Sequence, residues 1–235
     1  MTNLEFTSSF IDHVKLRFLD HNDVEQLKKL CTDWFPITYP DGWYKAVTKN
    51  PKFFSLAAIY NNVIIGVIVA EIRNRAKEDE DILGYWYPSD TKVGYILVLG
   101  TSKEYRRKGI ASILLKAFLS HVNDTENHCC KAVYLHVLST NAGAVLLYER
   151  HQFLRHKHLP LYYAIQGTRM DGYCYVIYAN GGCPPWTTLD FISATTNYFS
   201  QFAFCRASSY LMSRLWVLPR KILLGQKSSR IIRNL

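Results

Sequence analysis

Residues 93–115 constrain the fold of this chain more than any other stretch. An apolar run that is typical of a strand ends at Leu99, and a polar turn then passes through Gly109. Residues 112–119 follow with apolar side chains at the 3.6-residue period of a helix. The sequence therefore predicts a strand, a turn and a helix in direct succession.

The turn at residues 106–111 places three cations and two small residues at the predicted start of the helix. The first N–H groups of a helix have no partner within it and attract anions such as phosphate. Gly109 and Ala111 let an anion approach the backbone closely. The turn has neither the Gly-Lys-Ser/Thr ending of a P-loop nor the three glycines of a dinucleotide-binding motif. It predicts a different kind of phosphate site, with a solvated basic turn as the alternative.

Two motifs give the chain a family resemblance. Arg-Arg-Lys-Gly-Ile-Ala at 106–111 matches Arg/Gln-x-x-Gly-x-Gly/Ala, the pyrophosphate-binding turn of the GNAT superfamily of N-acetyltransferases. Asn141, a helix with Tyr148, and then Gln152-Phe153 resemble the family's fourth motif, which follows a strand, here expected at Ala132–Leu138. The resemblance implies acetyl-coenzyme A as cosubstrate, no metal, and an α/β fold with a central mixed sheet flanked by helices.

Shorter segments resemble one branch of that superfamily, the NatF-type N-terminal acetyltransferases, which are Golgi-associated. The similarity runs from about Leu16 to Trp186 and is carried by residues 33–41, 53–58, 134–138, 159–163 and 180–186. Thr38 stands where better-known members have Glu, so that carboxylate is missing here. The resemblance implies acetylation of the α-amine of peptides that begin with Met followed by Lys, Leu, Ile, Phe or a similar residue.

Acetyl transfer to a peptide amine needs a base, because an α-amino group has a pKa of about 7.7–8.0 and is mostly protonated at pH 7. His136, on the strand before Asn141, has a suitable pKa. Tyr95, near the start of the central strand, is its expected partner and would hold a water that relays the proton. Direct proton abstraction by Tyr95 is less favoured, since a phenol has a pKa of about 10. The alternative for His136 is a histidine that is simply packed in the core, and the alternative for Tyr95 is an ordinary packing role in its strand.

The resemblance also implies the binding residues. Tyr39, Leu97 and Tyr163 are expected to contact the peptide, with Tyr162 and Tyr163 on a loop after a strand at Phe153. A hydrophobic rim or a dimer surface is the alternative for these tyrosines. Coenzyme A, with its pantetheine paired like an extra strand, is expected to contact Leu99, Gly100, Thr101, Arg107, Lys108, Gly109, Ile110, Ala111, Ser112, Asn141, Tyr148, Glu149, Arg150 and His151.

The N-terminal half is expected to add further elements around this site. Periodicity, caps and turn residues predict a half-buried strand at Val14–Leu19, a helix capped by Asn22 and Glu25 that runs through Leu30, an ordered aromatic loop at 33–44, and a hairpin of strands 53–60 and 63–72 around Asn61-Asn62.

The C-terminal tail carries most of the excess charge. The chain has a formal charge of +9, and from Gly181 onward there are seven basic residues and one acid, so this segment supplies six of the nine charges. Its cations alternate with apolar residues at helical spacing, as in helices that lie in a membrane interface. We therefore expect an acetyltransferase domain at 1–185 and a membrane-binding tail at 186–235; two helices packed on the core are the alternative. The resemblance implies the cytosolic face of the Golgi membrane.

Other classes of function are less consistent with the sequence. A nucleic-acid module is not expected, because the basic residues are mixed with apolar ones rather than aligned with exposed aromatics. His156-x-His158 has no third ligand nearby, so a metal site is not expected either. Two rivals stay open: the same chemistry on a lysine ε-amine, including histone tails, and a non-catalytic adaptor that binds acyl-coenzyme A at membranes.

Overall fold

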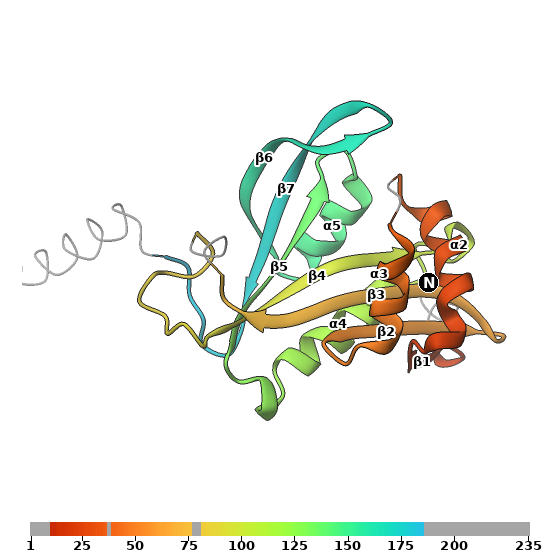
Figure 1. The fold of residues 1–235 in the computed structure, drawn as a ribbon, viewed down its shortest axis with the longest axis horizontal. Helices are drawn as coiled ribbons and strands as arrows, with labels where there is room; N and C mark the ends of the chain where they lie inside the picture. Colours follow the sequence, from red (N-terminus) through yellow and green to blue (C-terminus); the bar gives the residue numbers. More distant parts are fainter. Residues whose placement is uncertain (1–9, 37–38, 77–80, 186–235) are drawn as a thin grey trace, which may run out of the picture. The chain divides into compact units, whose positions relative to one another are not determined.

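The computed structural model describes residues 10–36, 39–76 and 81–185, which form a seven-stranded sheet with helices on both faces (Figure 1). The strand order is β1-β2-β3-β4-β5-β7-β6, and β4 and β5 are the one parallel pair of this sheet. This architecture confirms the predicted mixed α/β fold. The strands are β1 Lys15–Phe18, β2 Phe53–Tyr60, β3 Val63–Asn74, β4 Lys92–Thr101, β5 Cys130–Leu138, β6 Leu154–Ile165 and β7 Thr168–Tyr178. The α-helices are α2 Val24–Trp34, α3 Asp41–Lys49, α4 Ile110–Val122 and α5 Ala142–Arg150, and the 3-10 turns are η1 His21–Asp23, η3 Lys103–Tyr105 and η4 Thr125–Asn127.

The two faces of the sheet carry separate hydrophobic cores. Helix α4 packs against β2, β3 and β4 through Leu114, Leu115 and Phe118, all fully buried, and α5 adds Tyr148 to the same core. Helices α2 and α3 cover β2 and β3 on the opposite face (Figure 1) and form a second core that includes Leu27. Since each fully buried aliphatic or aromatic side chain stabilises the fold by about 1.5–3 kcal/mol, these cores hold the sheet rigid beneath the site.

The predicted hairpin around Asn61 and Asn62 is confirmed. Both residues have positive φ, 49° and 61°, as a two-residue type I′ turn requires, and Asn tolerates this conformation well. Tyr60 therefore pairs directly with Val63, and β2 and β3 run antiparallel from that point. The turn fixes the register of the two strands against which α4 packs.

The first strand forms, but the prediction that it is half-buried is wrong. All four residues of β1 are exposed, and Phe18 exposes 60% of its surface. Among the described strands, β1 is short, lies at the edge of the sheet and pairs with β2. The alternating pattern predicted the strand correctly but not the exposure of both its faces.

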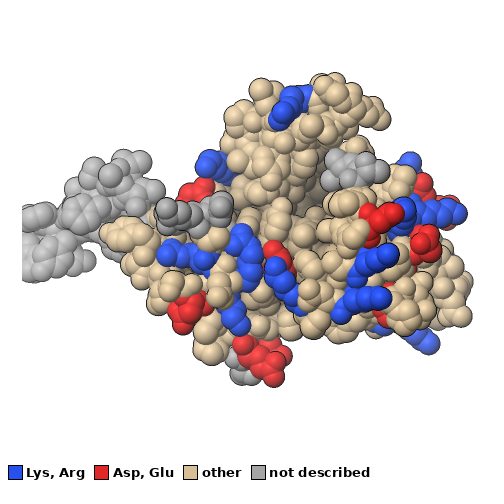
Figure 2. Space-filling view, in the orientation of Figure 1, with Lys and Arg blue, Asp and Glu red and all other residues tan. Residues whose placement is uncertain are grey.

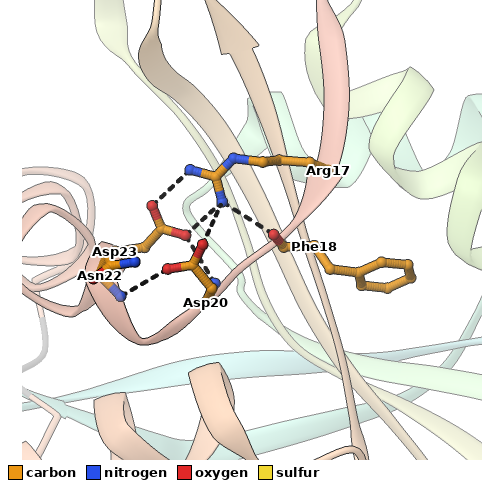
Figure 3. Close-up of polar contacts among 5 residues, drawn as sticks. All are labelled: Arg17, Phe18, Asp20, Asn22 and Asp23. Atoms are coloured by element: carbon orange, nitrogen blue, oxygen red, sulfur yellow. Dashed lines mark hydrogen bonds and ion pairs between the residues drawn. The ribbon is translucent and has the colours of Figure 1, made fainter.

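The predicted capping pair of Asn22 and Glu25 is wrong, because two aspartates form the capping box instead. The Asp20 carboxylate accepts the Asn22 N–H at 2.7 Å, and the Asp23 carboxylate accepts the Asp20 N–H at 2.9 Å (Figure 3). Arg17 of β1 donates from both terminal nitrogens to Asp23, at 2.6 and 2.7 Å. Asp23 is only 5% exposed, and the Arg17 guanidinium lowers the pKa of its carboxyl below 3.8. This contact joins the start of α2 to the sheet edge.

The aromatic loop is shorter than predicted. Helix α2 continues to Trp34 and α3 begins at Asp41, because Pro36 and Pro40 fall just outside the two helices, where proline is tolerated. Thr38 lies outside the described residues, as does the whole predicted tail, Trp186–Leu235. No helix in the described ranges is long and apolar enough to span a membrane.

Candidate active site

The site is built where the two parallel strands of the sheet separate. Strands β4 and β5 pair only from Lys92 to Ile96, although β4 continues to Thr101, and Figure 1 shows the two strands diverging beyond that point. Val98 lies opposite Val69 while Ile96 lies opposite Ala70, so Leu97 is the extra residue of a β-bulge. Beyond the bulge, the backbone groups of β4 that face β5 pair with no strand in the described part of the chain, which leaves them available to a ligand.

A cavity of about 850 Å³ occupies this opening. Figure 2 shows the molecule hollowed between the lobe of β6 and β7 and the part built on α2 and α3, with walls that are largely free of charged side chains. The cavity brings together all but two of the predicted site residues, whose individual roles stay predictions: Tyr39, Tyr95, Leu97, Leu99, Gly100, Thr101, Arg107, Gly109, Ile110, Ala111, Ser112, His136, Asn141, Tyr148, Arg150, His151 and Tyr163.

The two predicted residues that do not line the cavity have other partners. The Lys108 Nζ lies over the rings of Phe10 and Tyr105, 5.1 and 5.2 Å from their centroids, which is cation–π geometry. The Glu149 Oε1 accepts a hydrogen bond from the buried Tyr175 hydroxyl at 2.8 Å. Both side chains therefore have structural roles, and the turn presents its backbone rather than the Lys108 ammonium to the cavity.

The basic turn has the geometry of an anion site. Gly109 has φ of +85° and Arg107 has φ of +61°, and the first helical hydrogen bond at this end runs from the Ile113 N–H to the Gly109 carbonyl. The amides of residues 107–112 make no hydrogen bond of good geometry to the other described residues. With the helix dipole of α4 behind them, these amides favour negative charge. Thr101 Oγ1, at the same end of the cavity, is buried and likewise has no partner among the described residues.

The other part of the cavity holds the candidate base. The His136 Nδ1 lies 3.4 Å from the Tyr95 hydroxyl and 2.8 Å from the Tyr162 hydroxyl. Burial lowers the pKa of His136, so the imidazole is neutral at pH 7. Burial raises the pKa of Tyr95 to about 12, which keeps its phenol protonated. A neutral imidazole held beside two hydroxyls that both donate and accept is suited to receive a proton.

Sequence reasoning missed Tyr162 as a site residue and misplaced its segment. Tyr162 and Tyr163 lie within β6 and not on a loop; the strand is irregular between Leu159 and Tyr163, and Leu161 has φ of +53°. That irregularity replaces simple alternation and places both tyrosines at the cavity. The pairing of adjacent tyrosines was visible in the sequence, whereas the irregularity in the strand was not.

Aromatic residues from the α2–α3 segment close the cavity on its apolar side. Trp34 and Phe35 line it although neither was assigned to the site, and a Cβ on Gly100 would come within 2.5 Å of the Trp34 ring. Tyr39 stacks on Trp43, with centroids 4.2 Å apart. Glycine at position 100 therefore lets these rings approach the β4 backbone, and the aromatic content of residues 33–44 was the sequence signal for this wall.

The histidines of β6 have carboxylate partners rather than a metal-binding arrangement. His158 Nε2 lies 2.9 Å from Asp171, and His156 Nε2 lies 3.6 Å from Asp81, which also binds Lys157 at 3.1 Å. Over the described ranges, no group of three or more His, Cys, Asp or Glu side chains is placed to hold a metal ion.

The profile of the Acetyltransferase (GNAT) family matches residues 24–153, more than half of the chain. The chain therefore belongs to the GNAT family of acetyltransferases, which confirms the resemblance drawn from its turn and its Asn141 motif. It is 48% identical to N-alpha-acetyltransferase 60 of Xenopus tropicalis over 88% of this chain and 87% of the relative. The Danio rerio N-alpha-acetyltransferase 60 is 50% identical, over 82% and 80% of the two chains. The crystal structure of Arabidopsis thaliana NAA60 with a bisubstrate analogue superposes with a TM-score of 0.66, at 29% identity, over 72% of this chain and 99% of that one.

Proposed function

We propose that this acetyltransferase moves the acetyl group of acetyl-coenzyme A to the α-amine of protein N-termini. The observation that carries the proposal is that one cavity combines two features. The amides of residues 107–112 make no well-formed hydrogen bond to other described residues, and a neutral His136 lies beside two tyrosine hydroxyls. The backbone amides can bind the diphosphate of the coenzyme, and the neutral imidazole can accept a proton from the amine. The relatives named for N-alpha-acetyltransferase activity support the same choice of acceptor.

The coenzyme would lie along the opened edge of β4. Its diphosphate would be bound by the amides of 107–112, and its pantetheine would pair with the free backbone groups of Leu97–Thr101. The Thr101 hydroxyl, which has no partner among the described residues, would supply a further polar contact. Asn141, whose Oδ1 accepts the Ala144 N–H at 3.2 Å, and Tyr148 would contact the thiol end.

The reaction needs no covalent intermediate with the protein. The amine nitrogen attacks the thioester carbonyl, the C–N bond forms as the C–S bond breaks, and the thiolate leaves. His136 would receive the amine proton through a water held by Tyr95, since the raised pKa of Tyr95 makes the phenol itself a poor base. A proton is finally needed on the coenzyme thiolate, and the protonated imidazole can return it.

The peptide would enter on the aromatic side of the cavity. Tyr39, Leu97 and Tyr163 are the proposed contacts for its first residues, which we expect to be Met followed by Lys, Leu, Ile, Phe or a similar residue. The apolar walls formed by Trp34 and Phe35 support a hydrophobic first side chain.

We further propose that the tail at 186–235 attaches the enzyme to the cytosolic face of the Golgi membrane, where membrane proteins present their N-termini. The support is its sequence, in which six excess positive charges alternate with apolar residues from Gly181 onward. A homodimer through the tyrosine-rich rim is a separate proposal, which gel filtration would test.

The test uses purified full-length chain, acetyl-coenzyme A and peptides that vary in their first two residues, with release of coenzyme A thiol as the signal. Free Met-Lys and Met-Leu peptides should be acetylated, and a Met-Lys peptide with a blocked α-amine should not. Activity that survives the block would mean lysine acetylation instead. Coenzyme binding without any turnover would favour the adaptor.

A further inference from the structure

The segment between β3 and β4 presents two adjacent aromatic side chains to solvent. Tyr85 is 85% exposed and Trp86 is 44% exposed, and their rings meet edge to face with centroids 5.5 Å apart. Within the described ranges, Tyr85 is the most exposed of the large apolar or aromatic side chains. Single exposed apolar residues are ordinary, but two neighbouring amphipathic rings on one loop form a small surface that favours a partner.

The backbone that carries these rings is held firmly. Arg75 Nη1 donates to the carbonyls of Leu83 and Gly84, at 3.2 and 2.8 Å, and the Tyr178 hydroxyl donates to the Ile82 carbonyl at 3.1 Å. Ile82 and Leu83 are themselves buried in a core with β5 and β7. The stretch that leads into the two rings is therefore anchored to the folded domain.

The same loop contacts the end of the catalytic domain. The Tyr87 hydroxyl accepts the Cys183 N–H at 2.9 Å and lies 3.2 Å from the Cys183 Sγ. Cys183 is three residues before Trp186, where the proposed membrane-binding tail begins. If the tail binds a membrane, as proposed above, the chain runs into that membrane from residues that contact this loop.

We propose that Tyr85 and Trp86 insert into the headgroup layer of that membrane and give the catalytic domain a second, orienting contact with lipid. Tyr and Trp concentrate at membrane–water interfaces because their rings are apolar at one end and hydrogen-bonding at the other. The inference rests on the proposed attachment of the tail and adds a contact from the folded domain.

The charges around the loop indicate which kind of contact this is. Figure 2 shows both basic and acidic side chains near the end of β3 and the loop that follows it. Asp81 is paired with Lys157, and the sequence adds Glu78, Asp79 and Glu80 to the same segment. Mixed charge gives little attraction to anionic lipid, so the contribution of the two rings should be the same on neutral and anionic vesicles and insensitive to salt.

The test is co-sedimentation of the full chain with phosphatidylcholine vesicles, with and without phosphatidylserine. The double variant Y85A/W86A should bind about tenfold more weakly in both cases, a loss of about 1.4 kcal/mol. Phe18→Ala is the matched control, because Phe18 is 60% exposed but lies on the edge strand β1, and its binding should equal that of the wild type. Acetylation of a soluble peptide should be unchanged in all three proteins, which checks that they are folded.

A second measurement places the indole directly. Brominated lipid should quench more tryptophan fluorescence in the wild type than in Trp86→Phe, which keeps an aromatic ring and most of the affinity. Equal vesicle binding by the wild type and Y85A/W86A, or equal quenching in the wild type and W86F, would overturn the proposed contact of Tyr85 and Trp86 with lipid. The proposed attachment of the tail would not be affected. A full-length wild type that binds no vesicles would overturn the proposed attachment of the tail, and this inference with it.

Discussion

Replacing Asp23 by Asn is expected to destabilise the catalytic domain by about 2 kcal/mol. The carboxylate is 5% exposed and accepts two hydrogen bonds from Arg17, at 2.6 and 2.7 Å, and one from the Asp20 N–H (Figure 3). A hydrogen bond to a charged group contributes about 1.5–3 kcal/mol, and breaking a fully buried ion pair costs about 3–5 kcal/mol. Because 45% of the Arg17 side chain stays in water, the loss falls near the lower figure. The contact secures α2, whose last residue, Trp34, forms a wall of the cavity.

The assay is urea and thermal unfolding of D23N against the wild type, where about 2 kcal/mol corresponds to a fall in Tm of about 4–8 °C for a domain of this size. Arg17 lowers the pKa of Asp23 below its unfolded value of 3.8. The stabilisation is therefore fully present above pH 3.8 and is lost as the pH falls through the folded-state pKa, so the two proteins should converge there.

Asp41→Asn is the control for that experiment. Asp41 binds Lys28 at 2.6 Å, but 73% of its side chain is exposed, so its Tm should not change. Equal losses for D23N and D41N would refute the reasoning, as would a deficit in D23N that persists unchanged in acid.

Three further predictions concern the site itself. His136→Ala should lower kcat/KM by about 10²–10⁴ without unfolding the protein, and a loss under threefold would rule out a catalytic base there. Burial lowers the pKa of His136 below 6.5, so the imidazole is neutral and can act as a base at pH 6.5 and above. As the pH falls below 6.5, the wild-type rate should therefore decrease more steeply than the H136A rate. Identical pH profiles of the two proteins from pH 5.5 to 9 would contradict this. Gly109→Ala should raise KM for acetyl-coenzyme A about tenfold with kcat nearly unchanged, because φ is +85° and the new Cβ would lie 2.9 Å from Ile11 Cδ1; an unchanged KM would argue against the turn as the diphosphate site.

Local signals in the sequence predicted the elements around the site well. The strand, turn and helix of residues 93–115 form as expected, although α4 begins at Ile110 rather than at residue 112. The helix expected between Asn141 and Gln152 forms and runs from Ala142 to Arg150, because Asn141 accepts the Ala144 N–H as an N-cap. Such features depend on residues close together in the chain.

Features that depend on distant partners were not predictable in the same way. The capping box at Asp20 and Asp23 is favoured over Asn22 and Glu25 because Arg17, on another element, neutralises the buried carboxylate. Tyr162 reaches His136 because β6 is irregular where it pairs with β7, a matter of register between strands. The residue pattern of one segment does not show which residues of another segment it will contact, so neither feature could be predicted from it.

The most direct test of the account is a calorimetric titration with coenzyme A joined through an acetyl link to the α-nitrogen of a Met-Lys peptide. If one cavity holds the carrier near residues 107–112 and the amine near His136, this conjugate should bind at one site and more tightly than coenzyme A or the peptide alone. A conjugate that binds no more tightly than coenzyme A would contradict the account, because the two halves would then not share the cavity.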